Sequence, residues 1–315
     1  MVRGKDKFEW PLLTVNILVY NRKKEVEITL SKITKELDYP KNKLEIIVVD
    51  NASTDGTYEM IKEKFPEVKV IRLNKNIGIA GWNYGFKEGR GEYFLVLDDD
   101  SHPEKGLKEA IFFLNQNKQV GILACKIIGG MFQTKGLSHL QDWIGFIGCG
   151  AIIRKEVVEE VGGFAEWIFL YSHEWEYGLR VLNKGWKIVY FDKCIVNHRT
   201  SVIHRSYKRL RIFTTRNELG IIYSYFDGFY KYLLMFRTLF WNLVTFRKEG
   251  SMSILYTLRG FLEFIKIKHK LTILPVDSTV QQKYIQHFWS CQPILPTIFK
   301  KVKKIIRKNL ERRHV

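Results

Sequence analysis

The chain has 315 residues, of which 46% are apolar and 27% are charged. A chain of this length and composition can bury a sizeable core, which excludes a wholly disordered protein. Its net charge of +18 is concentrated at one end, because residues 201–315 hold 22 basic and 6 acidic side chains. The sequence therefore predicts a nearly neutral globular body over residues 1–200, followed by a strongly basic third.

The cysteines and the apolar runs indicate the compartment. The four cysteines are widely separated and lack metal-ligand spacing, which is typical of reduced thiols in the cytoplasm rather than of a disulfide scaffold or a zinc module. The first thirty residues lack a signal-peptide pattern, and no apolar run reaches the ~18 residues of a membrane span. We therefore expect a cytoplasmic protein without a spanning helix.

Apolar runs alternate with helix-forming stretches in the first hundred residues. The predicted strands cover residues 14–20, 44–50, 68–72 and 93–97, and the predicted helices cover residues 24–37, 55–65 and 79–88. Unbroken β-branched runs separated by helices predict parallel strands that are covered on both faces. Ligands of such sheets bind outside the carboxyl ends of the strands, where the polar residues of this half concentrate.

The pattern continues with less regularity. Further strands are predicted at residues 120–128, 147–154 and 187–191, and helices at residues 105–115 and 174–183. Beyond a continuous domain that ends near residue 205, helical and aromatic-rich composition covers residues 208–232, 233–247 and 253–270. We expect a mixed α/β domain followed by a helical region.

Three consecutive carboxylates, Asp98, Asp99 and Asp100, follow the strand predicted at residues 93–97. Adjacent carboxylates repel each other unless a cation or hydrogen-bond donors compensate. Oxygen ligands of this kind suit Mg²⁺ or Mn²⁺, which substrate phosphates then complete. The sequence therefore predicts a divalent-cation site here, and a solvated acidic loop is the alternative.

Asp50 ends another predicted strand and opens a polar turn, DNASTDGT. By itself this turn fits a ligand site and an ordinary helix cap equally well. Neither a G-x-G-x-x-G element after the first strand nor a phosphate-binding P-loop motif is present, which disfavours a dinucleotide or P-loop site.

Several motifs in the correct order resemble family 2 glycosyltransferases of the GT-A fold, a Rossmann-like mixed sheet flanked by helices. They are TVNILVYNR (14–22), VVDNASTDGT (48–57), NIGIAGWNYG (76–85), YFLVLDDD (93–100), GCGAIIR (148–154), GGF (162–164), FLYSHEWEYGLR (169–180) and IVNHRTS (195–201). The resemblance covers roughly residues 10–220 and is strongest to the rhamnosyltransferase-like branch of bacterial surface-polysaccharide synthesis. The resemblance and the composition together predict a catalytic domain over residues 1–205 (nucleotide-sugar half 10–110, acceptor half 111–205). Composition predicts a helical region over 206–270 and a basic amphipathic tail over 271–315.

The resemblance also implies roles for individual residues along a nucleotide-diphospho-sugar. The positions that match nucleotide-sugar contacts are Tyr20, Asn21, Asp50, Gly81, Asn83, Asp98 and Asp99. Asp100 matches the direct metal ligand of the family's D-x-D element, and His198 matches a histidine near the diphosphate. The expected cofactor is Mn²⁺ or Mg²⁺.

The catalytic-base motif departs from the family. Where the family has Glu-Asp, this chain has His173-Glu174. The alignment puts Glu174 at the base position, and Glu176 is the second candidate. An ordinary surface histidine remains an explanation of His173.

The implied activity is inverting transfer of a hexose or deoxyhexose, such as rhamnose, from a UDP- or dTDP-sugar. The acceptor is expected to be a lipid-linked glycan or a polysaccharide. A catalytically silent nucleotide-sugar- or membrane-binding protein on the same fold is the alternative, which only the His173-Glu174 departure supports.

The basic tail reads TIFKKVKKIIRKNLERRHV from residue 297. Its apolar residues follow helical spacing and eight basic residues lie between them, which predicts binding to an anionic membrane on its inner face. A charged helix packed on the catalytic body is the alternative for this tail. For residues 223–246, contact with the membrane and packing on the catalytic domain are two interpretations that the sequence supports equally. No nucleic-acid motif is present, so no nucleic-acid partner is predicted.

Overall fold

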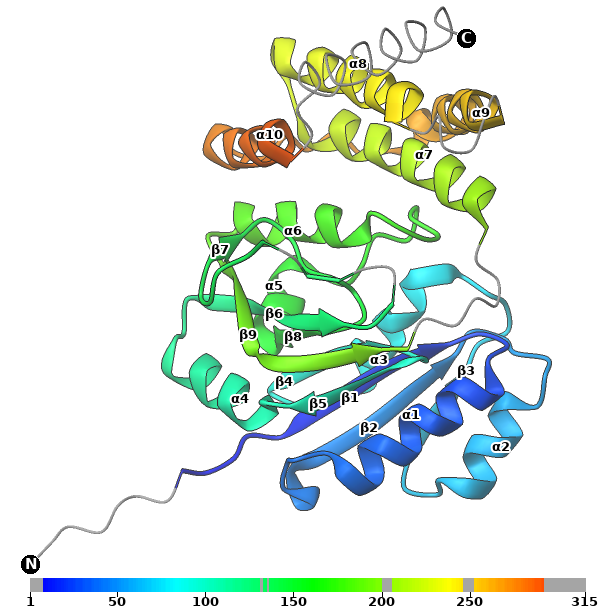
Figure 1. The fold of residues 1–315 in the computed structure, drawn as a ribbon, viewed down its shortest axis with the longest axis vertical. Coiled ribbons are helices and arrows are strands. Elements are labelled where there is room, and N and C mark those ends of the chain that lie inside the picture. The colour runs from blue at the N-terminus through cyan, green and yellow to red at the C-terminus, as the bar shows by residue number, and fades with distance from the viewer. Residues whose placement is uncertain (1–7, 131–132, 135, 200–205, 246–251, 292–315) are drawn as a thin grey trace, which may run out of the picture. The chain divides into compact units, whose positions relative to one another are not determined.

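A computed structural model describes residues 8–130, 133–134, 136–199, 206–245 and 252–291. The chain divides into two compact units, Met1–Phe213 and Thr214–Val315. The first unit is a mixed α/β unit, and the second is helical in its described residues (Figure 1). The tail sequence from residue 297, and with it the predicted amphipathic helix, lies outside the described residues.

Four parallel strands form one half of the sheet. They are β1 (Leu13–Val19), β2 (Leu44–Asp50), β3 (Lys69–Arg72) and β4 (Tyr93–Asp98), in the order β3-β2-β1-β4. The intervening helices are α1 (Lys23–Glu36), α2 (Thr57–Lys64), the 3₁₀ turn η2 (Gly78–Gly81) and α3 (Trp82–Glu88). The predicted alternation and the parallel pairing are confirmed.

Both faces of this half are covered, as its unbroken apolar strands predicted. Val15 and Ile17 of β1 pack in one core cluster with residues of α1, α2 and α4 (Leu107–Gln116). On the opposite face, Nδ2 of Asn16 donates to the carbonyl of Trp82 at the start of α3 (2.9 Å). Successive side chains of a strand point to opposite faces, so one strand contributes to two helical layers.

The other half of the sheet changes direction twice. β8 (Ala151–Arg154) pairs antiparallel with β4, and β6 (Val120–Ile128) pairs antiparallel with β8. β9 (Lys187–His198) pairs parallel with β6, β5 (Ser101–Lys105) pairs antiparallel with β9, and the short β7 (Asp142–Trp143) also joins β9. The carboxyl ends of β4 and β9 and the amino end of β8 therefore lie at the same edge of the sheet.

Two elements of this half differ from the predicted ones. The strand predicted at 187–191 continues to His198, because a register shift opposite Cys125 and Lys126 of β6 accommodates the polar residues that interrupt its apolar run. β5 was not predicted, since its sequence SHPEK contains proline and charged residues. Pairing with β9 on one side only makes it an edge strand, where proline is tolerated. The helices α5 (Lys155–Val161) and α6 (His173–Asn183) complete the unit.

Helix α7 (Tyr207–Tyr225) begins in the first unit and ends in the second. It ends before the predicted residue 232 because Gly228 adopts a positive φ of 54°, which favours glycine and starts a new helix. The second unit also contains α8 (Gly228–Thr245), α9 (Met252–Ile267), the 3₁₀ turn η4 (Lys268–Lys270) and α10 (Ser278–Cys291). None of the helices in the described part of the chain is both long and apolar enough to cross a bilayer.

Candidate active site

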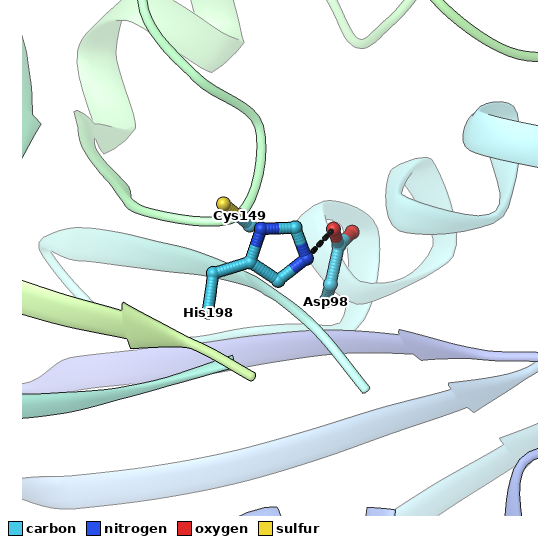
Figure 2. A group of neighbouring side chains, drawn as sticks. All are labelled: Asp98, Cys149 and His198. Carbon is cyan, nitrogen blue, oxygen red and sulfur yellow. Dashed lines mark ion pairs between the residues drawn. The ribbon is translucent and has the colours of Figure 1, made fainter. Parts of the chain in front are cut away.

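The predicted cation ligands meet at the carboxyl edge of the sheet. β4 ends at Asp98 and the chain turns directly into β5, whose Ser101 lies opposite His198 of β9. The amide of Asp98 donates to Oγ of Ser101 (3.0 Å), which tightens this turn. As a result, Nε2 of His198 lies 3.0 Å from Oδ1 of Asp100 and 3.8 Å from Oδ2 of Asp98. Figure 2 shows the imidazole beside the Asp98 carboxylate.

The cluster is buried except at Asp98, where solvent reaches it. The side chains of Asp100 and His198 are 0% and 2% exposed, whereas that of Asp98 is 36% exposed. Two carboxylates and an imidazole, one of them reachable from solvent, fit a divalent cation that also binds a ligand. Asp98, Asp100 and His198 are therefore the residues that can hold Mn²⁺ or Mg²⁺.

Asp99 faces α1 instead of this cluster. Nη1 of Arg22 lies 2.8 Å from Oδ1 of Asp99 and 2.9 Å from Oδ2 of Asp100, and the hydroxyl of Thr29 donates to the Asp99 carbonyl (2.7 Å). Burial raises the pKa of Asp99 to about 7, although the adjacent Arg22 opposes this rise. Sequence reasoning missed Arg22, for which the only signal was a basic residue directly after Tyr20 and Asn21.

The turn after β1 and the turn after β2 are joined. Asn21, at a positive φ of 51°, donates its amide to Oγ of Ser53 (2.9 Å), and its Oδ1 accepts the amide of Thr54 (2.7 Å). Tyr20 beside it is 38% exposed. The Asp50 side chain is fully buried, and its Oδ1 accepts the Ser53 amide (2.9 Å). The structure thus brings the predicted nucleotide residues of both turns together, and direct nucleotide contact stays a prediction.

Side-chain amides fix the segment in which η2 leads into α3, which contains Gly81 and Asn83. A Cβ atom at Gly81 would lie 2.4 Å from Cδ1 of Leu18, so a larger residue would fit only if the Leu18 side chain moved. Nδ2 of Asn83 donates to the carbonyl of Phe164 (2.9 Å), and its Oδ1 accepts the Phe164 amide (2.7 Å). Asn51, which sequence reasoning missed, donates to the Gly78 carbonyl (2.9 Å). In this structure Asn83 therefore joins the start of α3 to the loop that contains Phe164.

Glu174 lies in the first turn of α6. The two residues before this helix, Tyr171 and Ser172, both have positive φ (68° and 61°), a region that side chains rarely adopt. This turn sets α6 against the 144–150 segment, where the Gly148 amide donates to Oε1 of Glu174 (3.2 Å). Nδ1 of His173 lies 3.3 Å from Oε2 of Glu174, whose side chain is 19% exposed. Glu174 is thus oriented and still open to solvent.

Glu176, two residues further along the same helix, has different surroundings. Its side chain is 0% exposed, and its two oxygens lie 2.7 and 2.9 Å from Nε and Nη2 of Arg180. The same guanidinium donates to the carbonyls of Val161 (2.7 Å) and Gly163 (2.8 Å). The Glu176–Arg180 pair therefore anchors the 161–163 loop to α6.

His173 is buried, contrary to the surface-histidine explanation. It is 5% exposed, and its ring lies 5.7 Å from the ring of Trp82 and 5.2 Å from that of Phe164.

The sulfur of Cys149 lies within 4.8 Å of a carboxylate oxygen of Asp98 and of a ring nitrogen of His198. Burial raises the pKa of its thiol well above the usual value, and the nearby carboxylates of Asp98, Asp100 and Glu174 raise it further. The amide of the preceding residue, Gly148, donates to Glu174 (3.2 Å), so this short segment contacts both the cation cluster and Glu174. A site with a cation cradle on one side and an accessible carboxylate on the other can hold a phosphate-bearing substrate and accept a proton from a second one.

Comparison with known proteins identifies related chains. Residues 14–165 match the family described as Glycosyl transferase family 2. The probable glycosyltransferase YdaM of Bacillus subtilis is 26% identical over 250 residues, which are 71% of this chain and 59% of YdaM. The chain thus spans less than two thirds of YdaM, and it spans 19% of the poly(ribitol-phosphate) β-N-acetylglucosaminyltransferase TarS of Staphylococcus aureus, which is 34% identical over 110 residues.

Solved structures share the fold. GalNAc-T7 with UDP, GalNAc and Mn²⁺ superposes with a TM-score of 0.65 at 14% identity, over 91% of this chain and 59% of that chain. S. aureus TarS 1–349 in complex with UDP-GlcNAc superposes with a TM-score of 0.58 at 17% identity, over 95% and 92% of the two chains. The predicted GT-A fold is confirmed, and the rhamnosyltransferase-like branch stays a prediction.

Proposed function

We propose, on the premise that residues 14–165 belong to glycosyl transferase family 2, that the protein transfers a sugar from a nucleotide-diphospho-sugar with inversion of the anomeric centre. The observation that carries the proposal is that His198 lies 3.0 Å from Asp100 and 3.8 Å from Asp98, while the neighbouring 148–149 segment contacts both this cluster and Glu174. A leaving diphosphate needs positive charge, and an attacking hydroxyl needs a base, so the two sides supply complementary chemistry.

Asp98, Asp100 and His198 would hold Mn²⁺ or Mg²⁺. When bound, such a cation stabilises the negative charge that develops on the departing diphosphate. Mn²⁺ accompanies UDP and GalNAc in the GalNAc-T7 structure, which supports this assignment. The exposed edge of Asp98 leaves room for phosphate oxygens beside the buried pair formed by Asp100 and His198.

Glu174 is the proposed catalytic base. Its carboxylate would accept the proton of the acceptor hydroxyl as that oxygen attacks the anomeric carbon. The Gly148 amide fixes Oε1 (3.2 Å), and we assign the hydroxyl to Oε2, which lies 3.3 Å from Nδ1 of His173. Glu176 lacks this freedom because both of its oxygens bind Arg180 (2.7 and 2.9 Å) and it is fully buried.

The donor and the acceptor are the finer part of the proposal. Tyr20, with 38% of its surface exposed beside the joined turns, would stack on the nucleotide base. We propose a UDP- or dTDP-linked hexose or deoxyhexose as donor, rhamnose included, and a lipid-linked glycan or polysaccharide as acceptor. The complex of TarS with UDP-GlcNAc supports a uridine donor.

A donor panel tests the activity. Purified protein with Mn²⁺ is incubated with UDP-, dTDP- and GDP-sugars, with and without membrane-extracted glycolipid, and release of the nucleoside diphosphate is measured. We expect release from one nucleotide class that rises when acceptor is added and stops with a chelator. If no donor is cleaved although one of them binds, the catalytically silent alternative is correct.

We also propose that the second unit binds an anionic membrane on its cytoplasmic face. On α9, Ile254, Leu258, Leu262 and Ile265 are 47%, 50%, 58% and 38% exposed, and their spacing puts them on one face of the helix. On α8, Phe229, Tyr232 and Phe236 are 75%, 71% and 68% exposed at similar spacing. The basic turn η4 follows α9 directly. Exposed apolar faces next to basic residues are typical of helices that lie in a membrane interface.

Flotation with vesicles that contain phosphatidylglycerol tests the membrane proposal. Leu258→Glu should weaken binding by roughly ten-fold or more, because burial of a leucine contributes about 1.5–3 kcal/mol. Gln282→Glu adds the same charge at an exposed position on a different helix, α10, and is the matched control. Equal flotation of both variants would refute the role of α9.

A further inference from the structure

Cys149 lies in the cation cluster although the proposed function gives it no role. It is 2% exposed and precedes β8, whose amino end shares the sheet edge with the carboxyl ends of β4 and β9. Its sulfur, a carboxylate oxygen of Asp98 and a ring nitrogen of His198 all lie within 4.8 Å of one another. Figure 2 shows these three side chains converging from separate segments of the chain.

The three donor atoms match a zinc ligand set. Bonds of about 2.3 Å to sulfur, 2.0 Å to nitrogen and 2.1 Å to oxygen in a tetrahedron separate the ligand atoms by about 3.4–3.6 Å. The separations of up to 4.8 Å in the structure need to close by at most about 1.4 Å. Asp98 has the most room to move among the three side chains, because it is 36% exposed whereas Cys149 and His198 are each 2% exposed.

The charge and the softness of the donors favour a particular class of cation. A thiolate and a carboxylate carry two negative charges, so the site with a bound divalent cation has no net charge, which suits its mostly buried position. Thiolate is a soft ligand that selects Zn²⁺ and related ions, whereas carboxylate and water suit Mg²⁺ and Mn²⁺. Three protein ligands leave a fourth position for water.

We propose that Asp98, Cys149 and His198 form a site for a thiophilic divalent cation such as Zn²⁺. Binding forms a metal–sulfur bond and releases the thiol proton to solvent. Because Asp98 and His198 also belong to the proposed Mn²⁺ or Mg²⁺ cradle, Zn²⁺ excludes that cation and inhibits transfer. The inhibition rests on the proposed function, whereas the binding does not.

Titration of the metal-free, full-length protein with CoCl₂ tests the binding directly. A bound thiolate gives Co²⁺ a charge-transfer absorption in the near ultraviolet, which carboxylate and imidazole ligands alone do not give. We expect this band with the wild-type protein and with Cys125→Ser, and its loss in Cys149→Ser. Cys125 is the matched control because it is another buried thiol, with its sulfur 3.4 Å from that of Cys194. A wild-type titration without the band, or the same band in Cys149→Ser, would overturn the proposal.

Two further measurements complete the test. The first is zinc-edge X-ray absorption of the wild-type protein loaded with one equivalent of Zn²⁺, which requires no variant. The spectrum should show one sulfur ligand at about 2.3 Å from the zinc. A ligand shell of nitrogen and oxygen alone would contradict the site. Cys149→Ser should bind Zn²⁺ at least about ten-fold more weakly, since loss of even an outer partner costs that much. Its Mn²⁺ affinity, followed by electron paramagnetic resonance, should stay within about two-fold, and an equal loss for both ions would overturn the selectivity.

Discussion

Replacement of Glu176 by alanine tests whether the two carboxylates of α6, Glu174 and Glu176, have different roles. The Glu176 carboxylate is fully buried and lies 2.7 and 2.9 Å from two nitrogens of Arg180. Removal of one partner of a buried ion pair leaves the other charge uncompensated and costs about 3–5 kcal/mol. The Arg180 side chain is 21% exposed and keeps its bonds to the carbonyls of Val161 and Gly163, so we expect the lower end, about 3 kcal/mol.

This loss should be visible as a change in Tm. For a unit of this size each kcal/mol corresponds to roughly 2–4 °C, so Glu176→Ala should melt roughly 6–12 °C below the wild-type protein. Glu174→Gln keeps the side-chain volume and the acceptor for the Gly148 amide, so its Tm should stay close to that of the wild-type protein. Differential scanning calorimetry of the full-length protein measures both. A Glu176→Ala protein that melts like the wild-type protein but no longer transfers sugar would refute the structural role and make Glu176 the base.

Three further predictions concern single contacts. Burial alone would raise the pKa of Glu45, but hydrogen bonds from the Arg90 amide and the Thr14 hydroxyl lower this pKa below its usual value. Glu45→Gln should therefore lower the free energy of unfolding at pH 7. The difference in urea midpoint between the two proteins should vanish as the pH falls through the folded-state pKa of Glu45. Asn83→Ala loses both bonds to the Phe164 backbone, which should cost about 2 kcal/mol in the same assay. Asp100→Asn should weaken Mn²⁺ binding at least about ten-fold in paramagnetic-resonance titrations, and an unchanged affinity would remove Asp100 from the cradle.

The parallel half of the sheet could be predicted because its signals are local. The strands carry apolar runs, and β1, β2 and β3 are each followed by a helix, so the chain order specifies the layers. The same rule puts Asp50 and Asp98 at one edge of the sheet. The placement of His198 could not be derived locally, since it depends on the pairing of β9 with β5.

The partners of the site residues could not be predicted because they are distant in sequence. Arg22 meets Asp99 across 77 positions, and no local pattern encodes that contact. Asn83 and Glu176 are the reverse case, because motif position suggests a ligand contact or a catalytic role while the structure shows bonds to a loop and to Arg180. Polar side chains that hold a site together and those that perform its chemistry look alike in the sequence.

The most direct test of the account is the rate of sugar transfer by Glu174→Gln. With the donor identified by the panel, donor binding is measured by calorimetry in Mn²⁺, and transfer is measured in single turnovers. The account predicts donor affinity within about two-fold of the wild-type protein and transfer slowed by about 10²–10⁴-fold, the range that a general base contributes. Wild-type transfer by Glu174→Gln would contradict the assignment of Glu174 as the base.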